Sequence, residues 1–211
     1  MIDAANDVAN EYGKTNIKEL YISNLTFTDV VSIGIENANQ SEVNKIDYVM
    51  FENVTFDHTG DYGVFIQQVA GTESIKNIIF KDCTFKNVKY GIMAKHIEAA
   101  NVTVEDCVFE DLGYNGIQLD NNLSGTIVID NNDFINTVDR PIRFGHLLAD
   151  SKVTISNSEF VNAEDSDGQV IKASTVETGA TVTLQANNWG TLETTQKGMF
   201  VGNTLTYFDA E

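Results

Sequence analysis

The sequence predicts an all-β fold: a single-stranded right-handed parallel β-helix, a solenoid of about seven coils, with a short N-terminal capping helix. Two observations lead to this prediction. A motif of Asn or Asp, two variable residues and an aromatic residue recurs, and its aromatic residues lie 24–29 positions apart. Short β-prone runs and turn-forming residues alternate between the copies, without a helical periodicity of useful length. Repeats of about 20–50 residues are typical of solenoids, propellers and arrays.

The two ends of the chain differ from the repeat. Residues 1–13 are rich in Ala, and the apolar positions 2, 5, 8, 9 and 12 suit a short amphipathic helix that Gly13 would end. A solenoid needs a covered end, so we expect this helix to be an N-terminal cap and the β-helix domain to occupy residues 14–211. Residues 204–208 predict a last strand at the other end.

The repeated motif predicts both the core and the corners of each coil. Its aromatic residues would stack along the axis about 4.8 Å apart, and they would bury surface that a single coil cannot enclose. Asn and Asp tolerate the left-handed backbone of a tight bend and satisfy turn amides, so we assign their column no chemistry. The copies are Asn24–Phe27, Asn53–Phe56, Asp82–Phe85, Asp106–Phe109, Asn131–Phe134, Asn157–Phe160 and a degraded copy that ends at Trp189.

The Asn/Asp column at positions 24, 53, 82, 106, 131 and 157 resembles that of the pectate-lyase-like superfamily of parallel β-helix proteins. The resemblance extends from about residue 18 to the C-terminus. It implies the fold and a ligand along the outer face of one sheet. It does not select an activity, because that superfamily includes lyases, hydrolases, adhesins and phage tailspikes. A propeller is the main rival architecture, but its blades are longer than these units.

The composition excludes several classes of partner. The formal net charge is −18, from 31 acidic and 13 basic residues, whereas nucleic-acid binding needs a basic stripe. We therefore expect no nucleic acid, and no membrane insertion because no apolar stretch is long enough. The acidic charge favours solubility. The turns at 165–167 and 130–133 leave calcium open as an alternative, although neither matches a calcium-loop signature, and we assign no cofactor.

The two cysteines, Cys83 and Cys107, occupy the same position in neighbouring units. We expect them to stack with parallel side chains, which would place their Cβ atoms slightly beyond the usual disulfide range. This favours a pair of reduced, buried thiols. Two ligands cannot form a structural zinc site, so no metal site is predicted.

A second landmark, a Gly or Pro before a β-prone residue, follows each aromatic residue by six or seven positions. Its copies are Gly34-Ile35, Gly63-Val64, Gly91-Ile92, Gly116-Ile117 and Pro141-Ile142. If each β-prone residue faces inward, its successor faces outward. This predicts an outer column of Glu36, Phe65, Met93, Gln118 and Arg143, with Lys172 beside Arg143. A second outer column contains Gln67, Lys95, Asp120 and Gly145, with His96 and His146 at its edge.

These columns gather basic residues in an acidic chain, and they predict a site for an acidic, uronate-containing polysaccharide. Arg143 and Lys172 suit a carboxylate, Gln118 and Asp120 suit hydroxyls, and Phe65 or Met93 suits an apolar sugar face. The candidate ligand-binding residues are Lys95, Gln118, Asp120, Arg143, His146 and Lys172. The alternative is a charge-balanced, solvated sheet without a ligand.

Three functions follow in order of preference. The first is an extracellular or cell-surface module of bacterial or phage origin that binds polysaccharide without catalysis, as a monomer or as part of a larger multidomain chain. The second is a polysaccharide lyase acting on a uronate polymer. The lyase family's calcium-binding acidic cluster is not recognisable, however, and no adjacent Asp pair supports hydrolysis, so catalytic residues stay unassigned. The third is a structural adhesin or spacer.

Overall fold

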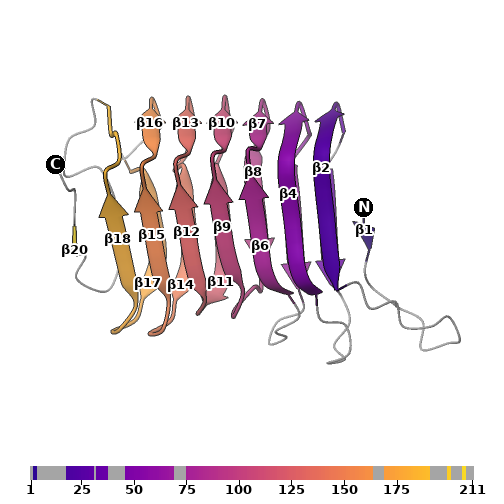
Figure 1. Cartoon of the computed structure of the whole chain (residues 1–211). Helices are drawn as coiled ribbons and strands as arrows, with labels where there is room; N and C mark the ends of the chain where they lie inside the picture. The colour runs from indigo at the N-terminus through magenta and orange to yellow at the C-terminus, as the bar shows by residue number, and fades with distance from the viewer. Residues whose placement is uncertain are drawn as a thin grey trace, which may run out of the picture.

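The computed structural model describes residues 2–3, 18–30, 32–37, 46–68, 75–163, 169–190, 199–200 and 206–207. These residues form two sheets whose strands all pair in parallel and are added in chain order along one axis (Figure 1). Parallel pairing between strands about 24–30 residues apart in sequence is the arrangement of a β-helix, in which each coil adds one strand to each side. The predicted all-β solenoid is confirmed.

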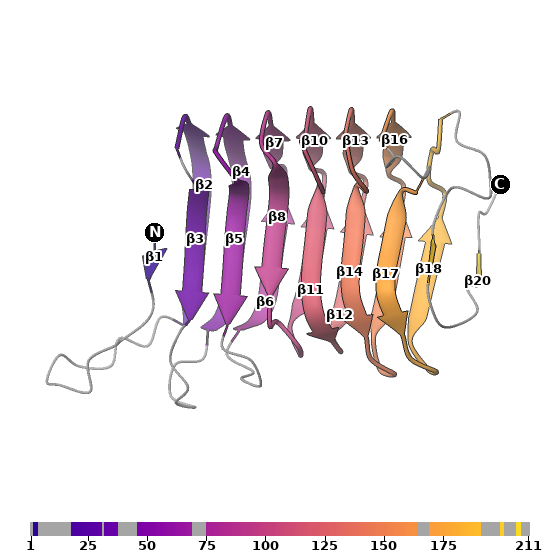
Figure 2. The ribbon, with the colours of Figure 1, turned by 180° about the vertical axis from the view of Figure 1, so that it is seen from behind.

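The eight-stranded sheet forms one side of the solenoid (Figure 2). Each of its strands comes from a different coil, so neighbours in the sheet are equivalent residues of successive repeats. In order along the axis they are β1 (Ile2–Asp3), β3 (Ser32–Asn37), β5 (Tyr62–Gln68), β8 (Tyr90–Lys95), β11 (Ile117–Leu123), β14 (Ile142–Leu147), β17 (Ile171–Val176) and β19 (Met199–Phe200).

The twelve-stranded sheet forms the rest of the wall and bends at the Asn or Asp of the motif. β2 (Glu19–Thr28) and β4 (Ile46–Asp57) run through the bend, whereas the following coils divide there into two strands. The strands before the bend are β6 (Ile75–Lys81), β9 (Asn101–Glu105), β12 (Thr126–Asp130), β15 (Lys152–Ser156), β18 (Thr181–Gln185) and, in the last pairing, β20 (Thr206–Tyr207). The strands after it are β7 (Thr84–Lys86), β10 (Val108–Glu110), β13 (Asp133–Ile135) and β16 (Glu159–Val161).

Two columns of left-handed residues turn the chain in each coil. The predicted motif column has φ values of 51–55° from Asn24 to Asn157, and Asn53 Nδ2 donates a hydrogen bond to Asn24 Oδ1 at 2.8 Å. The sequence analysis missed the second column, two residues after each aromatic residue. Its members are Asp29, His58, Asn87, Asp111, Asn136 and Asn162, with φ values of 48–55°. Short polar side chains recur in both columns because they tolerate this backbone region.

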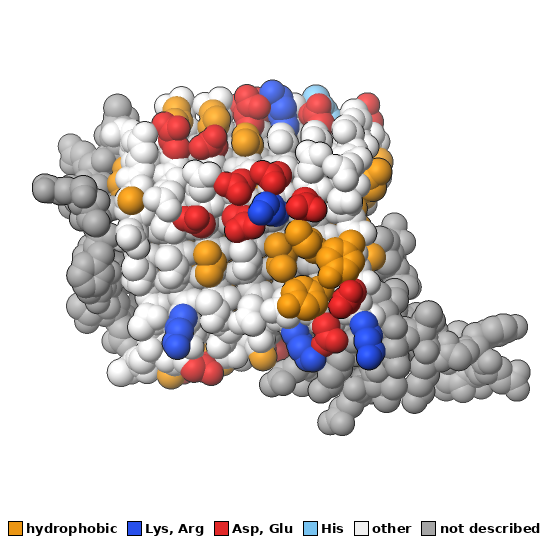
Figure 3. All heavy atoms as spheres, viewed as in Figure 1, with side chains coloured by type: hydrophobic (Ala, Val, Ile, Leu, Met, Phe, Trp, Pro, Cys, Tyr) orange, Lys and Arg blue, Asp and Glu red, His pale blue; other side chains and the backbone are white. Residues whose placement is uncertain are grey.

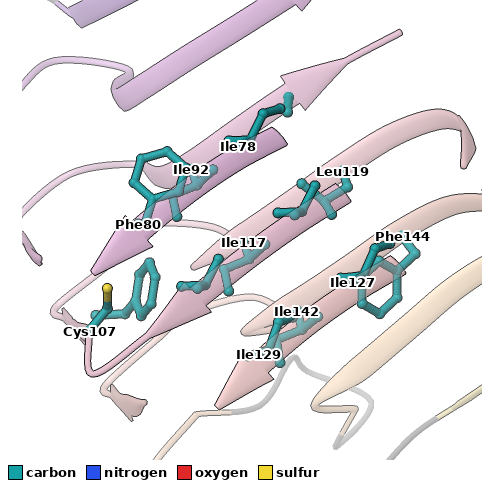
Figure 4. Close-up of a cluster of buried hydrophobic side chains, with 14 of the residues drawn as sticks. Ile78, Phe80, Ile92, Cys107, Ile117, Leu119, Ile127, Ile129, Ile142 and Phe144 are labelled. Carbon is teal, nitrogen blue, oxygen red and sulfur yellow. The ribbon is translucent and has the colours of Figure 1, made fainter. Parts of the chain in front are cut away.

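The predicted aromatic column is the centre of the core. Seven rings from Phe27 to Trp189 stack with centroid distances of 4.8–5.5 Å. A shorter stack of Phe51 on Phe80 packs edge-on against it. The inward residues of the eight-stranded sheet, such as Ile117 and Ile142, lie fully buried on the other side of this core (Figure 4). The core is therefore built from columns of equivalent residues.

The Gly landmark exists because the aromatic residue of the next coil fills the space beside it. A Cβ on Gly91 would lie 2.5 Å from the carbonyl oxygen of Gly116 and 2.8 Å from the Phe109 ring. Gly63 meets Phe85 and Gly116 meets Phe134 in the same way. The absence of a side chain at this corner lets the coils approach each other.

The predicted alignment of the first coil is wrong. A register shift between Ser32 and Ile33 pairs Ile33 with Val64 and Gly34 with Phe65, so Gly34 is not equivalent to Gly63. Glu36 consequently pairs with Gln67 and belongs to the second outer column. The observed pairing from Ile33 onward therefore differs from the predicted one by two residues, which preserves the inward and outward alternation.

The predicted capping helix over residues 1–13 falls almost entirely outside the described residues. Only Ile2 and Asp3 are described, and they form β1, which pairs with β3 rather than beginning a helix. The described segments contain no helix that is long and apolar enough to cross a membrane. At the other end, β20 lies within the predicted final strand and pairs with β18.

The two cysteines are free and buried, as predicted, and they begin an inward polar column. The backbone N–H of Cys83 donates to Cys107 Sγ at 3.4 Å, and that of Cys107 donates to Asn132 Oδ1 at 3.0 Å. The column continues through Ser158 and Asn187. Each side chain satisfies an amide of the preceding coil, which a buried corner requires.

Replacing Gly91 with Ala should lower the free energy of unfolding by about 1–3 kcal/mol, because overpacking forces neighbours to move. Gly113→Ala is the matched control, since its Cβ would meet nothing closer than 3.6 Å. Denaturant unfolding of both variants measures the difference. Equal stabilities would show that the corner has room for a side chain.

Phe109→Ala should cost about 3–5 kcal/mol, because it removes a fully buried ring from the middle of the aromatic column. Val138→Ala, at a position 71% exposed, should change stability by less than about 0.5 kcal/mol. Thermal and denaturant unfolding compare the two variants. Similar losses in both would mean that the column is not the main source of stability.

Cys83 and Cys107 should react slowly with thiol reagents in the native protein. Both cysteines are buried, which keeps reagents away from their sulfur atoms, and burial also raises the pKa of the Cys107 thiol well above its ordinary value. Titration of denatured, unreduced protein should then detect both thiols. Rapid reaction before denaturation would contradict the buried stack, and no reaction after denaturation would reveal a disulfide.

Candidate functional site

The eight-stranded sheet is seen in Figure 2, and the alternating burial along its strands places the first predicted outer column on the outward face. Phe65 pairs with Met93, Met93 with Gln118, Gln118 with Arg143, and Arg143 with Lys172. The strand alternation predicted this register correctly from β5 to β14, and the placement of Lys172 beside Arg143, made because a lysine is unfavourable in the core, is also confirmed. The structure therefore brings Gln118, Arg143 and Lys172 onto three adjacent strands.

The second outer column is shorter than predicted. Gln67, Lys95 and Asp120 pair in register, but a shift between Leu119 and Asn122 then inserts an extra residue into β11. Asn121 takes a left-handed conformation there, with φ of 70°. Gly145 lies opposite this bulge, and a Cβ on it would be 2.5 Å from the Asn121 carbonyl oxygen. The bulge ends the column at Asp120.

The two histidines lie at the edge of this face, each beside a carboxylate. His146 pairs with Asn122 and Thr175 in the sheet, and its Nε2 atom is 3.1 Å from Glu177 Oε1. His96 Nδ1 lies 3.9 Å from a carboxylate oxygen of Glu98. His146 thus lies beside the Glu177 carboxylate, near the end of β14 and three residues after Arg143.

Gln118 and Arg143 carry buried polar atoms that lack a partner among the described residues. Gln118 is only 4% exposed although it faces outward. Its Nε2 atom donates to Asp120 Oδ2 at 2.8 Å, whereas its Oε1 atom and Arg143 Nε have no hydrogen bond. Buried polar atoms are normally satisfied, and the hydroxyls of Thr59 and Thr137 share this state elsewhere in the described part of the chain.

Most other cations in the described part of the chain are paired with carboxylates. The pairs are Lys76–Asp47, Lys81–Glu105, Lys86–Glu110, Lys89–Asp61 and Arg140–Asp139. Within the same described part, Arg143 and Lys172 have no carboxylate partner. Lys95 instead lies over the Phe65 ring, with its Nζ atom 5.7 Å from the ring centroid. This face therefore holds uncompensated positive charge.

A column of three tyrosines, which we call the tyrosine ladder, borders this face and was missed by the sequence analysis. The rings of Tyr62, Tyr90 and Tyr114 stack at centroid distances of 5.3 and 5.1 Å. Tyr62 also lies 5.1 Å from Phe65, which joins the ladder to the first outer column. The signal was present as a Tyr one or two residues before three of the Gly landmarks.

The electrostatics link the ladder to Arg143. Burial raises the pKa of Tyr90 above its ordinary value, and the neighbouring Tyr62 and Tyr114 raise it further. Arg143 opposes this rise, because a cation favours the phenolate. The guanidinium therefore lies near enough to influence the tyrosine ladder.

The opposite face has a different character. Acidic side chains gather on the twelve-stranded sheet (Figure 3), where Glu52, Lys81, Glu105 and Asp130 occupy one register row. In the turn considered for calcium, Asp130 Oδ1 already accepts hydrogen bonds from Ser156 and Asn157. The other turn, 165–167, is outside the described residues. No group of three or more potential metal ligands occurs among the residues described.

The family model for the right-handed beta helix region matches residues 11–189. The chain belongs to the right-handed β-helix family. Comparison with curated proteins and with solved structures gave no match. Family membership establishes the right-handed solenoid, and what the outer face does must be argued from its side chains.

Proposed function

We propose that this right-handed β-helix is an extracellular or cell-surface module that binds an acidic, uronate-containing polysaccharide without catalysis. The binding surface is the outward face of the eight-stranded sheet around Gln118, Arg143 and Lys172. The resemblance to the pectate-lyase-like superfamily belongs to this proposal and supports a carbohydrate ligand.

The observation that carries the proposal is the unpaired state of Arg143 and Lys172. They are direct neighbours on β14 and β17, in a chain of net charge −18 whose other described cations are mostly neutralised. A carboxylate of the ligand would supply the missing charge and accept hydrogen bonds from the terminal guanidinium nitrogens of Arg143. A planar guanidinium suits this contact because it binds a carboxylate through two parallel hydrogen bonds.

The other candidate binding residues near Arg143 and Lys172 could contact the uncharged parts of a sugar. Asp120 is an acceptor for hydroxyls, and the buried Gln118 holds it in place through the hydrogen bond from Nε2. A site with one or two cations, a few fixed polar atoms and apolar neighbours such as Met93 is typical of small-molecule and glycan-sized ligands. His146 lies at the margin of this surface, beside Glu177.

The arrangement of the cations supports binding rather than elimination chemistry. A lyase needs a base close to the group that neutralises the substrate carboxylate. The Lys95 ammonium lies over Phe65 of β5, on the side of β8 that faces away from β14. Lys95 and Arg143 are thus directed to different parts of the face, and the basic residue beside Arg143 is Lys172, which the proposal assigns to the ligand carboxylate.

Arg143→Ala should lower the association constant for the preferred uronate polymer about tenfold or more, because a charge-assisted hydrogen bond is lost. Arg143→Lys should recover only part of the affinity, and binding should weaken as salt rises. Calorimetry with pectin, alginate and glycosaminoglycan fragments measures these effects.

Lys172→Ala should show the same loss, whereas Lys152→Ala is the matched control. Lys152 is an exposed lysine of β15 in the twelve-stranded sheet, so its removal changes the net charge equally without touching the proposed surface. Unchanged unfolding midpoints would exclude a folding defect. Failure of the wild-type chain to bind any of the polymers would leave a structural spacer as the better interpretation. Release of unsaturated uronate, seen by absorbance, would replace the proposal with a lyase.

A further inference from the structure

The tyrosine ladder ends in a ring that is partly open. Tyr90 is covered by Tyr62 on one side and by Tyr114 on the other, whereas Tyr114 has an aromatic neighbour only on the Tyr90 side among the described residues. Tyr114 is 46% exposed, a large value for an aromatic side chain in an ordered stack. A ring with an exposed surface beside a proposed ligand site offers an apolar contact.

The next coil places polar groups, rather than another ring, beside Tyr114. Asn115 Nδ2 donates to the Arg140 carbonyl oxygen at 2.6 Å, which aligns Asp139 and Arg140 with residues 114–115. Arg140 is fixed by its contact with Asp139 at 3.2 Å and by donation from Nε to Gln169 Oε1 at 3.0 Å. The ring thus borders a preordered network of carboxylate, guanidinium and amide groups.

The ladder and the proposed site form one continuous surface. Tyr114 lies three residues before the start of β11, whose Gln118 pairs with Arg143 on β14. Tyr62 contacts Phe65 at the other end, and adjacent strands are separated by about 4.8 Å along the axis. A ligand chain that runs along the axis can therefore contact both the cations and the ladder.

We propose that Tyr114, at the open end of the tyrosine ladder, is a stacking subsite for a pyranose ring of the acidic glycan whose carboxylate binds Arg143 and Lys172. This inference rests on the proposed function. The C–H face of the sugar packs on the exposed ring, and Asp139 and Arg140 contact the hydroxyls at its rim. The subsite makes the surface selective for carbohydrate, because a flexible polyanion without sugar rings gains nothing from Tyr114.

The test compares oligogalacturonate and alginate oligomers with polyglutamate, a polyanion without sugar rings, by calorimetry. Tyr114→Leu should lower the association constant for the better-bound uronate oligomer about tenfold, the upper range for one aromatic contact. The association constant of Tyr114→Phe for the same oligomer should stay within about threefold of the wild-type value, because this variant keeps the ring. Polyglutamate binding should be the same for wild type and Tyr114→Leu. Tyr21→Leu is the matched control, since Tyr21 is 58% exposed on β2 of the other sheet.

The outcomes separate the subsite from the proposed function. If Arg143→Ala weakens uronate binding but Tyr114→Leu does not, the subsite is overturned and the proposed function stands. An equal loss with Tyr21→Leu, or an equal loss of polyglutamate binding, would also overturn the subsite. If the wild-type chain binds neither uronate oligomer, the proposed function falls and the subsite falls with it. Unchanged unfolding midpoints are required of every variant, and Tyr114→Thr, which also removes the ring, replaces Tyr114→Leu in the same comparison if the latter is unstable.

Discussion

Stacking of equivalent side chains between successive coils is the interaction on which the rest of the structure depends. A single coil encloses too little space for a core, so each inward side chain must find its partners in the coils before and after it. The rings of Phe56, Phe85 and Phe109 lie 4.8–4.9 Å apart and nearly parallel. This column fixes the height of every coil, and it also fixes the register of both sheets. An extra residue, such as the one between Leu119 and Asn122 of β11, is therefore accommodated as a local bulge, after which Leu123 still pairs with Leu147.

The corners obey the same constraint through the backbone. Two left-handed residues per coil, exemplified by Asn131 and Asn136, keep the bends superimposable. The inward column of Cys107, Asn132 and Ser158 satisfies the amides that these bends would otherwise bury without partners. The residues at inward and corner positions are therefore required for the fold itself. Any specificity of this solenoid has to lie in its outward columns, where one position per coil is free to vary.

The aromatic column and the first corner column were predictable because residue identity alone reveals them: Phe or Trp marks the core, and Asn or Asp marks the bend. The second corner column, from Asp29 to Asn162, was missed. The outer column from Phe65 to Lys172 was predictable because strand alternation could be counted from a Gly whose space is filled by Phe. Counting strand positions from the Gly failed in the first coil, because no nearby residue in the sequence reveals the register shift at Ser32. The tyrosine ladder was missed because Tyr114 lies in a turn, outside the strands to which alternation applies.

The ion pairs could not be predicted from the sequence, for a different reason. Lys81 and Glu105 are 24 residues apart, and they meet only because β6 and β9 are adjacent in register. The same geometry leaves Arg143 and Lys172 without a described carboxylate, which no inspection of neighbouring residues could reveal. Composition gave the total charge of −18 but not the separation of an acidic face from a face with free cations.

That separation explains how so acidic a chain can offer a surface to an acidic ligand. The carboxylates of Glu52 and Glu105 lie on the twelve-stranded sheet, across the core from Arg143, at about the 10 Å spacing of packed sheets or more. Salt at physiological strength screens charges over about 8 Å, so repulsion from the far face fades while direct contact with Arg143 persists. The remaining repulsion still opposes every anion alike. Discrimination among anions must then come from contacts that do not depend on charge, which in the proposed site are the fixed acceptors around Gln118 and the exposed ring of Tyr114.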